Sequence, residues 1–331
     1  MTASLVLFLK IARKFYGSLF GEQDMFQTLP CAELNAEFAS RKIFEMLNLD
    51  HPCMIARFGS NELGCLVNYL GIQHGAYPMR DYLSGRCPEW WWNKGMMKCM
   101  ETNAGFFPVT EDNLVRFCKL MLQDIEQLDI LGSWISLEKY VQHYFKKVYI
   151  TQLNLLEPFL CKHPWTKALD GKQVLVVHPF AELIESQYTN HRKELFSNPD
   201  ILPEFHLRTV KAVQSIGGEA NGFRDWFEAL EWMKGEMAKE PYDVALIGCG
   251  AYGFPLAAEA KRTGHKAVHL GGVLQHLFGI RGKRWENPSY GVREWQQPYG
   301  FYSNMMNEFW VKAGDDYKPK KAQEVEDATY W

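Results

Sequence analysis

The chain has 331 residues, of which 47% are hydrophobic and 23% are charged, and its formal net charge is -3 at pH 7. This composition excludes a disordered chain, and the length is sufficient for one large α/β domain. The small negative charge argues against a dedicated nucleic-acid binder, which usually carries a basic face. The eight cysteines form no C-x-x-C pair, which is typical of a reduced, cytosolic protein without cysteine-bound zinc.

The first predicted element is an amphipathic helix within residues 1–22. Residues 4–20 are too few and too charged to span a bilayer, and they lack the flanking regions of a signal peptide. Helical spacing places these apolar residues on one side: Leu5, Phe8, Leu9, Ala12, Phe15, Tyr16 and Leu19. Lys10, Arg13 and Lys14 lie around the other side. The pattern predicts either a helix on an anionic membrane surface or a helix packed on its own domain or in a dimer contact.

Strands alternate with helices through residues 23–285. Helical periodicity covers residues 34–47, 61–70, 112–127, 138–145, 223–239 and 252–263. Short apolar runs, typical of buried strands, cover residues 53–58, 129–134, 147–150, 173–177, 205–210, 244–247 and 267–270. The alternation predicts a single large α/β domain with a mainly parallel, Rossmann-like sheet and helices on both faces. Ligands of such sheets bind at the carboxyl ends of the strands.

Two aromatic regions interrupt or follow this pattern. Residues 77–108 are predicted to form a large irregular insertion over the sheet, and residues 286–331 an aromatic C-terminal extension with a charged tail. The aromatic residues concerned are Trp90, Trp91, Trp92, Trp285, Tyr290, Trp295, Tyr299, Phe301, Tyr302 and Trp310. We expect most to pack in the core, with one or two in an acceptor site. Flat rings suit a sugar or a nucleobase, and Trp and Tyr also suit a membrane interface.

The first candidate site follows the first predicted strand, in the segment 56–62. Arg57 is suited to bind phosphate as a bidentate donor, and Gly59 permits a turn. Glu62 is suited to bind a divalent cation or to act as a general base. The competing interpretation is a helix start, at which the helix dipole favours Glu62.

A second candidate is His178, at the end of the strand predicted over residues 173–177. It would lie beside the glycine turn that follows residue 247 if the two strands are neighbours. There it could donate to a diphosphate or act as an acid or base, because its ordinary pKa lies near neutral pH. A histidine at a strand end is equally typical of a purely structural contact.

The third candidate is a glycine turn between the strand at 244–247 and the helix at 252–263. Gly248, Gly250 and Gly253 have the G-x-G-x-x-G spacing, which favours phosphate binding at a helix N-terminus, and Tyr252 lies within the same turn. An NAD-binding protein usually has an acidic residue at the end of the second strand, but this strand ends at residues 268–272 without one. Close packing between helix and sheet would also explain the glycines.

The fourth candidate is the segment 269–285, after the last predicted strand. It supplies Gly271, Gly272, Gln275 and Arg281, followed by further basic residues. Such a run can neutralise a diphosphate leaving group, and the fork of Arg281 matches phosphate oxygens. The competing interpretation is a solvated basic loop.

Together these segments resemble the GT-D class of glycosyltransferases over roughly residues 50–285. The closest likeness is to GT-D-like proteins of bacterial surface-polysaccharide clusters, in the Arg-Phe-Gly-x-x-Glu-Leu stretch at 57–63 and the His-Leu-Gly-Gly-x-x-Gln stretch at 269–275. The resemblance implies sugar transfer from a nucleotide-diphosphate donor. It also implies an Asp-x-Glu motif for the metal and the diphosphate, of which only Glu62 carries over. Because Ser60 replaces the family's Asp, dependence on Mn²⁺ or Mg²⁺ is left open.

The expected function is therefore transfer of a sugar from a nucleotide-diphosphate donor, with a UDP-sugar favoured, to a glycan or lipid-linked acceptor. The expected setting is bacterial surface-polysaccharide synthesis at the cytoplasmic face of the membrane. The glycine turn and the Arg281 region would hold the donor diphosphate, while Arg57 would orient Glu62 or contact the leaving group. Two alternatives are kept open: an NAD(P)-dependent oxidoreductase, and a noncatalytic scaffold of a polysaccharide assembly complex.

Overall fold

The computed structural model describes residues 2–331 except 22–23, 217–220 and 320–329, so most of the predicted charged tail lies outside the described residues. Its centre is a seven-stranded, wholly parallel sheet in the order β3-β2-β1-β7-β6-β4-β5. The strands are β1 (Cys53–Ala56), β2 (Ile130–Ser133), β3 (Tyr149–Gln152), β4 (Gln173–His178), β5 (His206–Lys211), β6 (Val244–Ile247) and β7 (Lys266–His269). The predicted single-domain α/β fold is confirmed.

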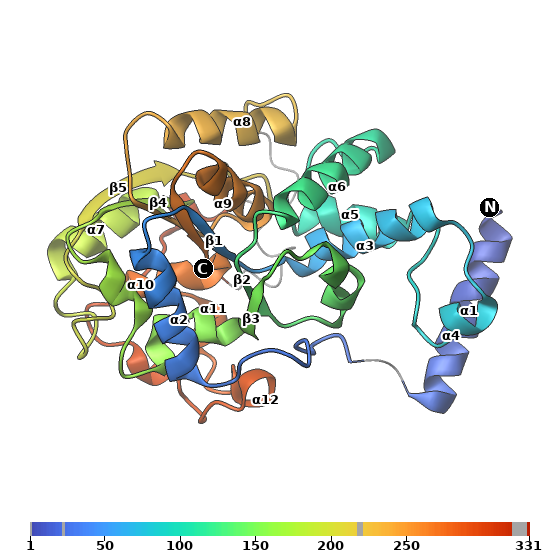
Figure 1. The fold of residues 1–331 in the computed structure, drawn as a ribbon, viewed down its shortest axis with the longest axis horizontal. Coiled ribbons are helices and arrows are strands. Elements are labelled where there is room, and N and C mark those ends of the chain that lie inside the picture. The colour runs from blue at the N-terminus through green and yellow to red at the C-terminus, as the bar shows by residue number, and fades with distance from the viewer. Residues whose placement is uncertain (1, 22–23, 217–220, 320–329) are drawn as a thin grey trace.

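Helices cover both faces of this sheet (Figure 1). The longer helices are α1 (Ala3–Phe20), α2 (Ala36–Asn48), α3 (Ser60–His74), α5 (Lys94–Thr102), α6 (Glu111–Ile125), α7 (Ala181–His191), α8 (Trp226–Met237) and α9 (Gly253–Arg262). Short helices are α4 (Met79–Leu83), α10 (Leu274–Leu277), α11 (Lys283–Glu286) and α12 (Val292–Trp295). The two short strands β8 (Ile280–Arg281) and β9 (Val311–Lys312) pair with each other apart from the main sheet.

The sheet separates two hydrophobic cores. In β1, Met54 and Ala56 join the core formed with α3, α6, α8 and α9, whereas Cys53 and Ile55 join the core formed with α2, α7 and α10. This alternation follows from the two-residue period of a strand, which sends successive side chains to opposite faces. All four β1 residues are buried because both faces are covered by helices.

Several helix starts follow from capping side chains. Thr110 accepts the N–H of Asn113 at the start of α6, and Asp225 accepts the N–H of Glu228 at the start of α8. The periodicity predicts a helix start at residue 223. The observed helix α8 begins at Trp226 because Asp225 caps it. Each cap satisfies a backbone donor that has no partner within its own helix.

The helix predicted over residues 138–145 is wrong. This segment consists of two tight 3₁₀ turns, Ser136–Tyr140 and Gln142–Tyr144. The Glu138 carboxylate folds back onto the end of β2, where it accepts hydrogen bonds from Ser133 Oγ and the Trp134 N–H. These contacts tie the segment to the sheet end and favour turns over a continuous helix.

The N-terminal helix lies with α4 at one end of the molecule, beyond α3 (Figure 1). It forms a small third core in which Leu9 packs against Tyr82 and Cys87. The segment 77–108, which the sequence predicts to be irregular, contains the helices α4 and α5. Helix α4 packs on α1, and helix α5 packs on α3. Within the described part of the chain, no helix has the length and apolar character needed to cross a membrane.

The fold has a topological switch point between β4 and β6. These strands are neighbours, yet α7, which follows β4, packs into one core, while α9, which follows β6, packs into the other. The connections thus leave in opposite directions from adjacent strands. In open α/β sheets, ligands bind in the crevice outside the carboxyl ends of the strands at such a point.

Candidate functional site

The predicted site segments meet along the carboxyl edge of the sheet. Arg57 follows β1, His178 ends β4, Gly248 follows β6 and Gly271 follows β7. The strand order β1-β7-β6-β4 brings these four positions side by side, although they are up to 214 residues apart in sequence. The edge therefore carries one residue from each of the four candidate segments.

His178 lies against the glycine turn, as expected for neighbouring strands. A Cβ placed on Gly248 would lie 2.9 Å from His178 Cδ2, and the His178 ring is buried. Its Nδ1 accepts the N–H of Phe180 at 3.0 Å, which leaves the proton on Nε2. Burial lowers the pKa of His178 to about 3. The neutral imidazole can donate a hydrogen bond to an anion, but it does not exchange protons near neutral pH.

The structural reason for having glycine differs among the three positions of the turn. A Cβ on Gly253 would lie 2.1 Å from the His269 ring, and one on Gly248 would lie 2.6 Å from the Gly271 carbonyl oxygen. Both glycines therefore permit close packing between protein segments. Gly250 has φ +57° with open space around it. Of the three, only Gly250 leaves its turn accessible to a ligand, whereas buried Tyr252 stacks on Trp226.

The turn that follows β7 at Gly271–Val273, the β7 turn, lies beside Arg57. Gly271 has φ +68°, and a Cβ at this position would lie 3.7 Å from Arg57 Cδ. Gly272 contacts a C-terminal residue, because a Cβ there would lie 2.2 Å from Cε1 of Tyr330. The turn thus joins the Arg57 side chain on one side to the end of the chain on the other.

Two residues at this edge carry no sequence motif: Trp134 and Glu138. The Arg57 guanidinium carbon lies 4.8 Å from the centroid of the Trp134 ring, within cation–π range, and Trp134 Nε1 donates to the Phe58 carbonyl at 2.9 Å. Burial raises the pKa of Glu138 to about 7, although nearby Arg57 opposes the shift. Only their position at the end of a predicted strand, or a few residues after it, could have indicated them.

Glu62 occupies the first turn of α3 and is buried. Its carboxylate folds back over Gly59, since a Cβ on Gly59 would lie 1.9 Å from Glu62 Oε2. This position matches the helix-start interpretation and places the carboxylate at the edge where β1 ends. Gly59 is the residue type that this arrangement requires.

Gln275 and Arg281 contact backbone of the C-terminal region. Gln275 Nε2 donates to the carbonyls of Arg281 at 3.0 Å and Tyr330 at 3.2 Å, while Arg281 Nη2 donates to the Asn307 carbonyl at 2.8 Å. The structure therefore brings Gln275 near the β7 turn but directs Arg281 toward the segment before β9. Arg284 lies beside the C-terminal residue on this turn, with its guanidinium carbon 5.2 Å from the Tyr330 ring centroid.

Most of the predicted aromatic residues pack within the protein. Trp90 and Trp91 contact Tyr82 in the core beneath α1, and Trp285, Tyr302 and Trp310 are buried. Trp92 lines a surface groove of about 720 Å³ together with Met97 and Phe107. Trp92 is therefore a member of the predicted set that has a groove beside it.

Across the described residues, no three His, Cys, Asp or Glu side chains gather in a way that could hold a metal ion. A cation at this edge would therefore need donor atoms from a ligand as well as from Glu62. Mg²⁺ is usually bound in this way, by one or two carboxylates and substrate phosphates.

Comparison with known proteins identifies the chain no further: no family model, curated protein or solved structure matches it. The fold and the site define a Rossmann-like α/β protein with a polar edge at its switch point.

Proposed function

We propose that the protein is a nucleotide-sugar-dependent glycosyltransferase that uses a UDP-sugar and a glycan or lipid-linked acceptor in bacterial surface-polysaccharide synthesis. The observation that carries the proposal is the convergence of Arg57, the β7 turn and His178 at the switch point. A guanidinium, backbone N–H groups and a neutral imidazole donor together suit the oxygens of a diphosphate. The two sequence stretches that resemble the GT-D class both begin at this same edge.

In the proposed reaction, the acceptor hydroxyl oxygen forms a bond to the anomeric carbon of the donor sugar. The bond from that carbon to the diphosphate oxygen breaks, and the electron pair leaves with the nucleoside diphosphate. Arg57 and the donors of the β7 turn stabilise the added negative charge. Glu62 takes the proton of the acceptor hydroxyl. If Mn²⁺ or Mg²⁺ binds, Glu62 would instead help to hold the ion, which would stabilise the phosphate charge, and the proton would pass to water.

The first test is a thermal-shift panel with UDP, GDP, CMP, ADP, UDP-sugars and NAD(P), each with and without Mn²⁺. A ligand that binds only the folded state raises the melting temperature. We expect a shift with a uridine nucleotide. A shift with NAD(P) alone would instead favour an oxidoreductase, and no shift with any ligand would favour the scaffold.

The second test concerns Glu62. We expect Glu62→Gln to slow UDP release from UDP-glucose or UDP-N-acetylglucosamine by at least about 100-fold, the usual cost of losing a general base. The matched control is Glu45→Gln, an exposed position on α2. Wild-type rates in a normally folded Glu62→Gln variant would remove Glu62 from the chemistry.

We propose further that α1 attaches the protein to the cytoplasmic face of an anionic membrane. Leu7, Phe8, Ile11, Phe15 and Leu19 form a continuous exposed face of α1, and each side chain is at least 60% exposed. The opposite side of the helix packs on the protein, where Arg13 lies over the Tyr82 ring and Lys10 pairs with Glu89.

The charge of α1 favours a lipid surface as the partner. Lys14 is exposed and lies beside this apolar face, and Ala3–Phe20 contains no acidic residue. An apolar face with basic flanking residues suits the boundary between headgroups and acyl chains of anionic lipids.

We expect Phe8→Glu combined with Phe15→Glu to abolish cosedimentation with vesicles of phosphatidylcholine and phosphatidylglycerol. The control is Trp232→Glu, at an exposed position on α8. If the double variant still cosediments, α1 does not attach the protein. If it loses a dimer while vesicle binding is unchanged, the helix is a contact between two copies.

A further inference from the structure

Tyr330 and Trp331 lie against the carboxyl edge of the sheet near the switch point. Tyr330 lies on the β7 turn, so close that a Cβ on Gly272 would be 2.2 Å from its ring. Gln275 Nε2 donates to its backbone carbonyl at 3.2 Å, and the Arg284 guanidinium lies 5.2 Å from its ring centroid. Three groups of the fourth candidate segment thus hold one aromatic residue.

Trp331 fills the adjoining space above β4. Its indole meets the Phe180 ring edge to face at a centroid distance of 6.2 Å, and its Nε1 donates to the Tyr317 carbonyl at 2.8 Å. Phe180 also contacts the Tyr317 ring, at 5.5 Å. Because the Phe180 N–H donates to His178, the residue that Trp331 contacts is itself bound to the end of β4.

These contacts have the character of a site for a flat polar ring. One ring lies on backbone next to a cation, and its residue's backbone carbonyl accepts from the Gln275 amide. The second ring meets the Phe180 ring edge to face and donates its Nε1 hydrogen to a carbonyl oxygen. Aromatic stacking with hydrogen bonds along the ring edge is how proteins hold nucleobases. The position is the one at which open α/β sheets bind ligands.

We propose that this crevice is a nucleotide site and that Tyr330 and Trp331 occupy it in place of the base, so that nucleotide and the chain's own terminal residues compete. Gly272, Gln275 and Arg284 contact Tyr330 when it is in place and contact the nucleotide when it is displaced. The choice of a nucleotide rests on the proposed function. Competition for the site is independent of sugar transfer and is measured by binding alone.

The competition predicts a definite change in the apparent Kd of the nucleotide. When the binding-competent state has fractional population f, the apparent Kd equals the intrinsic Kd divided by f. If the terminal residues occupy the crevice about nine-tenths of the time, their removal tightens nucleotide binding about tenfold. Residues that instead belonged to the binding site would have the opposite effect, because their removal would weaken binding.

The test is calorimetric titration of UDP, ADP and NAD into the full-length wild type and the Tyr330→Ala/Trp331→Ala double variant. We expect about tenfold tighter binding of one nucleotide by the double variant. The control is Tyr299→Ala/Trp232→Ala, which removes the same ring types from exposed positions and should match the wild type. The dipeptide acetyl-Tyr-Trp, added at millimolar concentration, should weaken binding again in the double variant.

Unchanged affinity in the double variant would overturn the proposal, as would weaker affinity. Failure of the double variant to bind any of the three nucleotides would also overturn it. UDP release from a UDP-sugar, measured on the same samples, keeps this failure distinct from failure of the transferase. A transferase with its donor elsewhere would release UDP at the same rate in both proteins.

Discussion

At the residue scale, the contact between Gly253 and His269 joins the helix after the glycine turn to the last strand of the sheet. His269 is buried, and its Nδ1 lies 3.2 Å from the Ile247 carbonyl oxygen at the end of β6. The ring thus occupies the space that a side chain at Gly253 would need. The third glycine of a dinucleotide motif permits the same kind of close packing. The spacing of the glycines therefore says more about packing here than about the ligand.

A pair of glycine substitutions tests this contact. We expect Gly253→Ala to lower the free energy of unfolding by about 1–3 kcal/mol, because the added methyl group overlaps the His269 ring. Gly235→Ala, on α8 with no atom within 4 Å of the added Cβ, should raise it by about 0.5–1 kcal/mol. Urea titration of both variants measures the two values. A neutral Gly253→Ala would mean that the ring moves aside at no cost.

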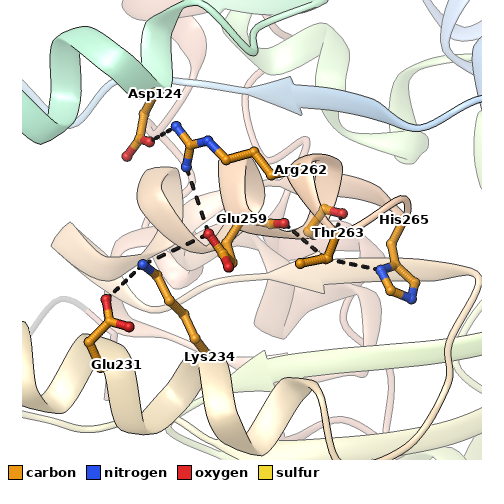
Figure 2. Close-up of polar contacts among 8 residues, drawn as sticks. Asp124, Glu231, Lys234, Glu259, Arg262, Thr263 and His265 are labelled. Atoms are coloured by element: carbon orange, nitrogen blue, oxygen red, sulfur yellow. Dashed lines mark hydrogen bonds and ion pairs between the residues drawn. The ribbon is translucent and has the colours of Figure 1, made fainter.

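At the element scale, α9 is held by contacts between its charged side chains and those of α6 and α8 (Figure 2). Arg262 reaches from α9 to Asp124 on α6, where the two side chains form an ion pair. Glu259 pairs with Arg262 and with Lys234 of α8, each at 3.8 Å. The network thus ties the last turns of α9, the helix that follows the glycine turn, to α6 and α8.

The pair between Arg262 and Asp124 gives a prediction with a pH dependence. Burial raises the pKa of Asp124 to about 6, even with Arg262 beside it, so its carboxylate is charged at pH 8 and largely protonated at pH 5. We expect Arg262→Met to cost about 2–3 kcal/mol at pH 8, because a fully buried charge loses its partner. At pH 5 the cost should fall below about 1 kcal/mol, since Asp124 is protonated.

Chemical denaturation at the two pH values measures this difference. Lys239→Met is the control, because Lys239 belongs to an exposed pair with Glu236 and should change stability by less than about 0.5 kcal/mol at either pH. Equal costs of Arg262→Met at pH 5 and pH 8 would contradict the assigned charge state of Asp124.

Elements whose pattern is local were predictable from the sequence. The apolar runs at 173–177 and 244–247 coincide with β4 and β6, and the amphipathic period at 112–127 closely matches α6. The helix predicted over residues 138–145 was wrong because the conformation of this segment depends on a tertiary contact. Its Glu138 carboxylate binds at the end of β2, the strand that precedes the segment. Local periodicity carries no information about such a contact between elements.

At the scale of the whole molecule, strand order decides which residues form the site. The sequence shows that His178 and Gly248 each follow a strand, but only the pairing of β4 with β6 makes them neighbours. The contact between Tyr330 and Gly272 is even less predictable from a local sequence pattern, because the two residues are 58 positions apart. The candidate residues were therefore predictable singly, whereas their arrangement required the tertiary structure.

Buried ionisable groups on several elements determine how the whole molecule responds to pH. Burial lowers the pKa of His178, His269 and His276 from the ordinary 6.5 to about 3. Below pH 6.5 the unfolded chain binds protons that the folded chain does not. Through these groups, stability falls as the pH drops from about 6.5 toward 3.

Three buried carboxyl groups act in the opposite direction. Burial raises the pKa of Asp124 to about 6, of Glu138 to about 7 and of Glu157 to about 8. Above their ordinary values of 3.8 and 4.5, the folded chain keeps protons that the unfolded chain has released. Through these groups, stability falls as the pH rises from about 4 toward 8.

The two sets of groups predict a stability maximum close to pH 6, where the folded and unfolded chains bind about equal numbers of protons. Urea denaturation between pH 4 and pH 9 would locate the maximum. Glu157→Gln, which keeps an oxygen to accept the Tyr302 hydrogen bond, removes one proton from the folded side and should move the maximum upward by up to about one pH unit. Glu45→Gln, at an exposed position, should leave it unchanged. A maximum at pH 8 or above in the wild type would mean that these carboxyl groups are charged in the folded protein.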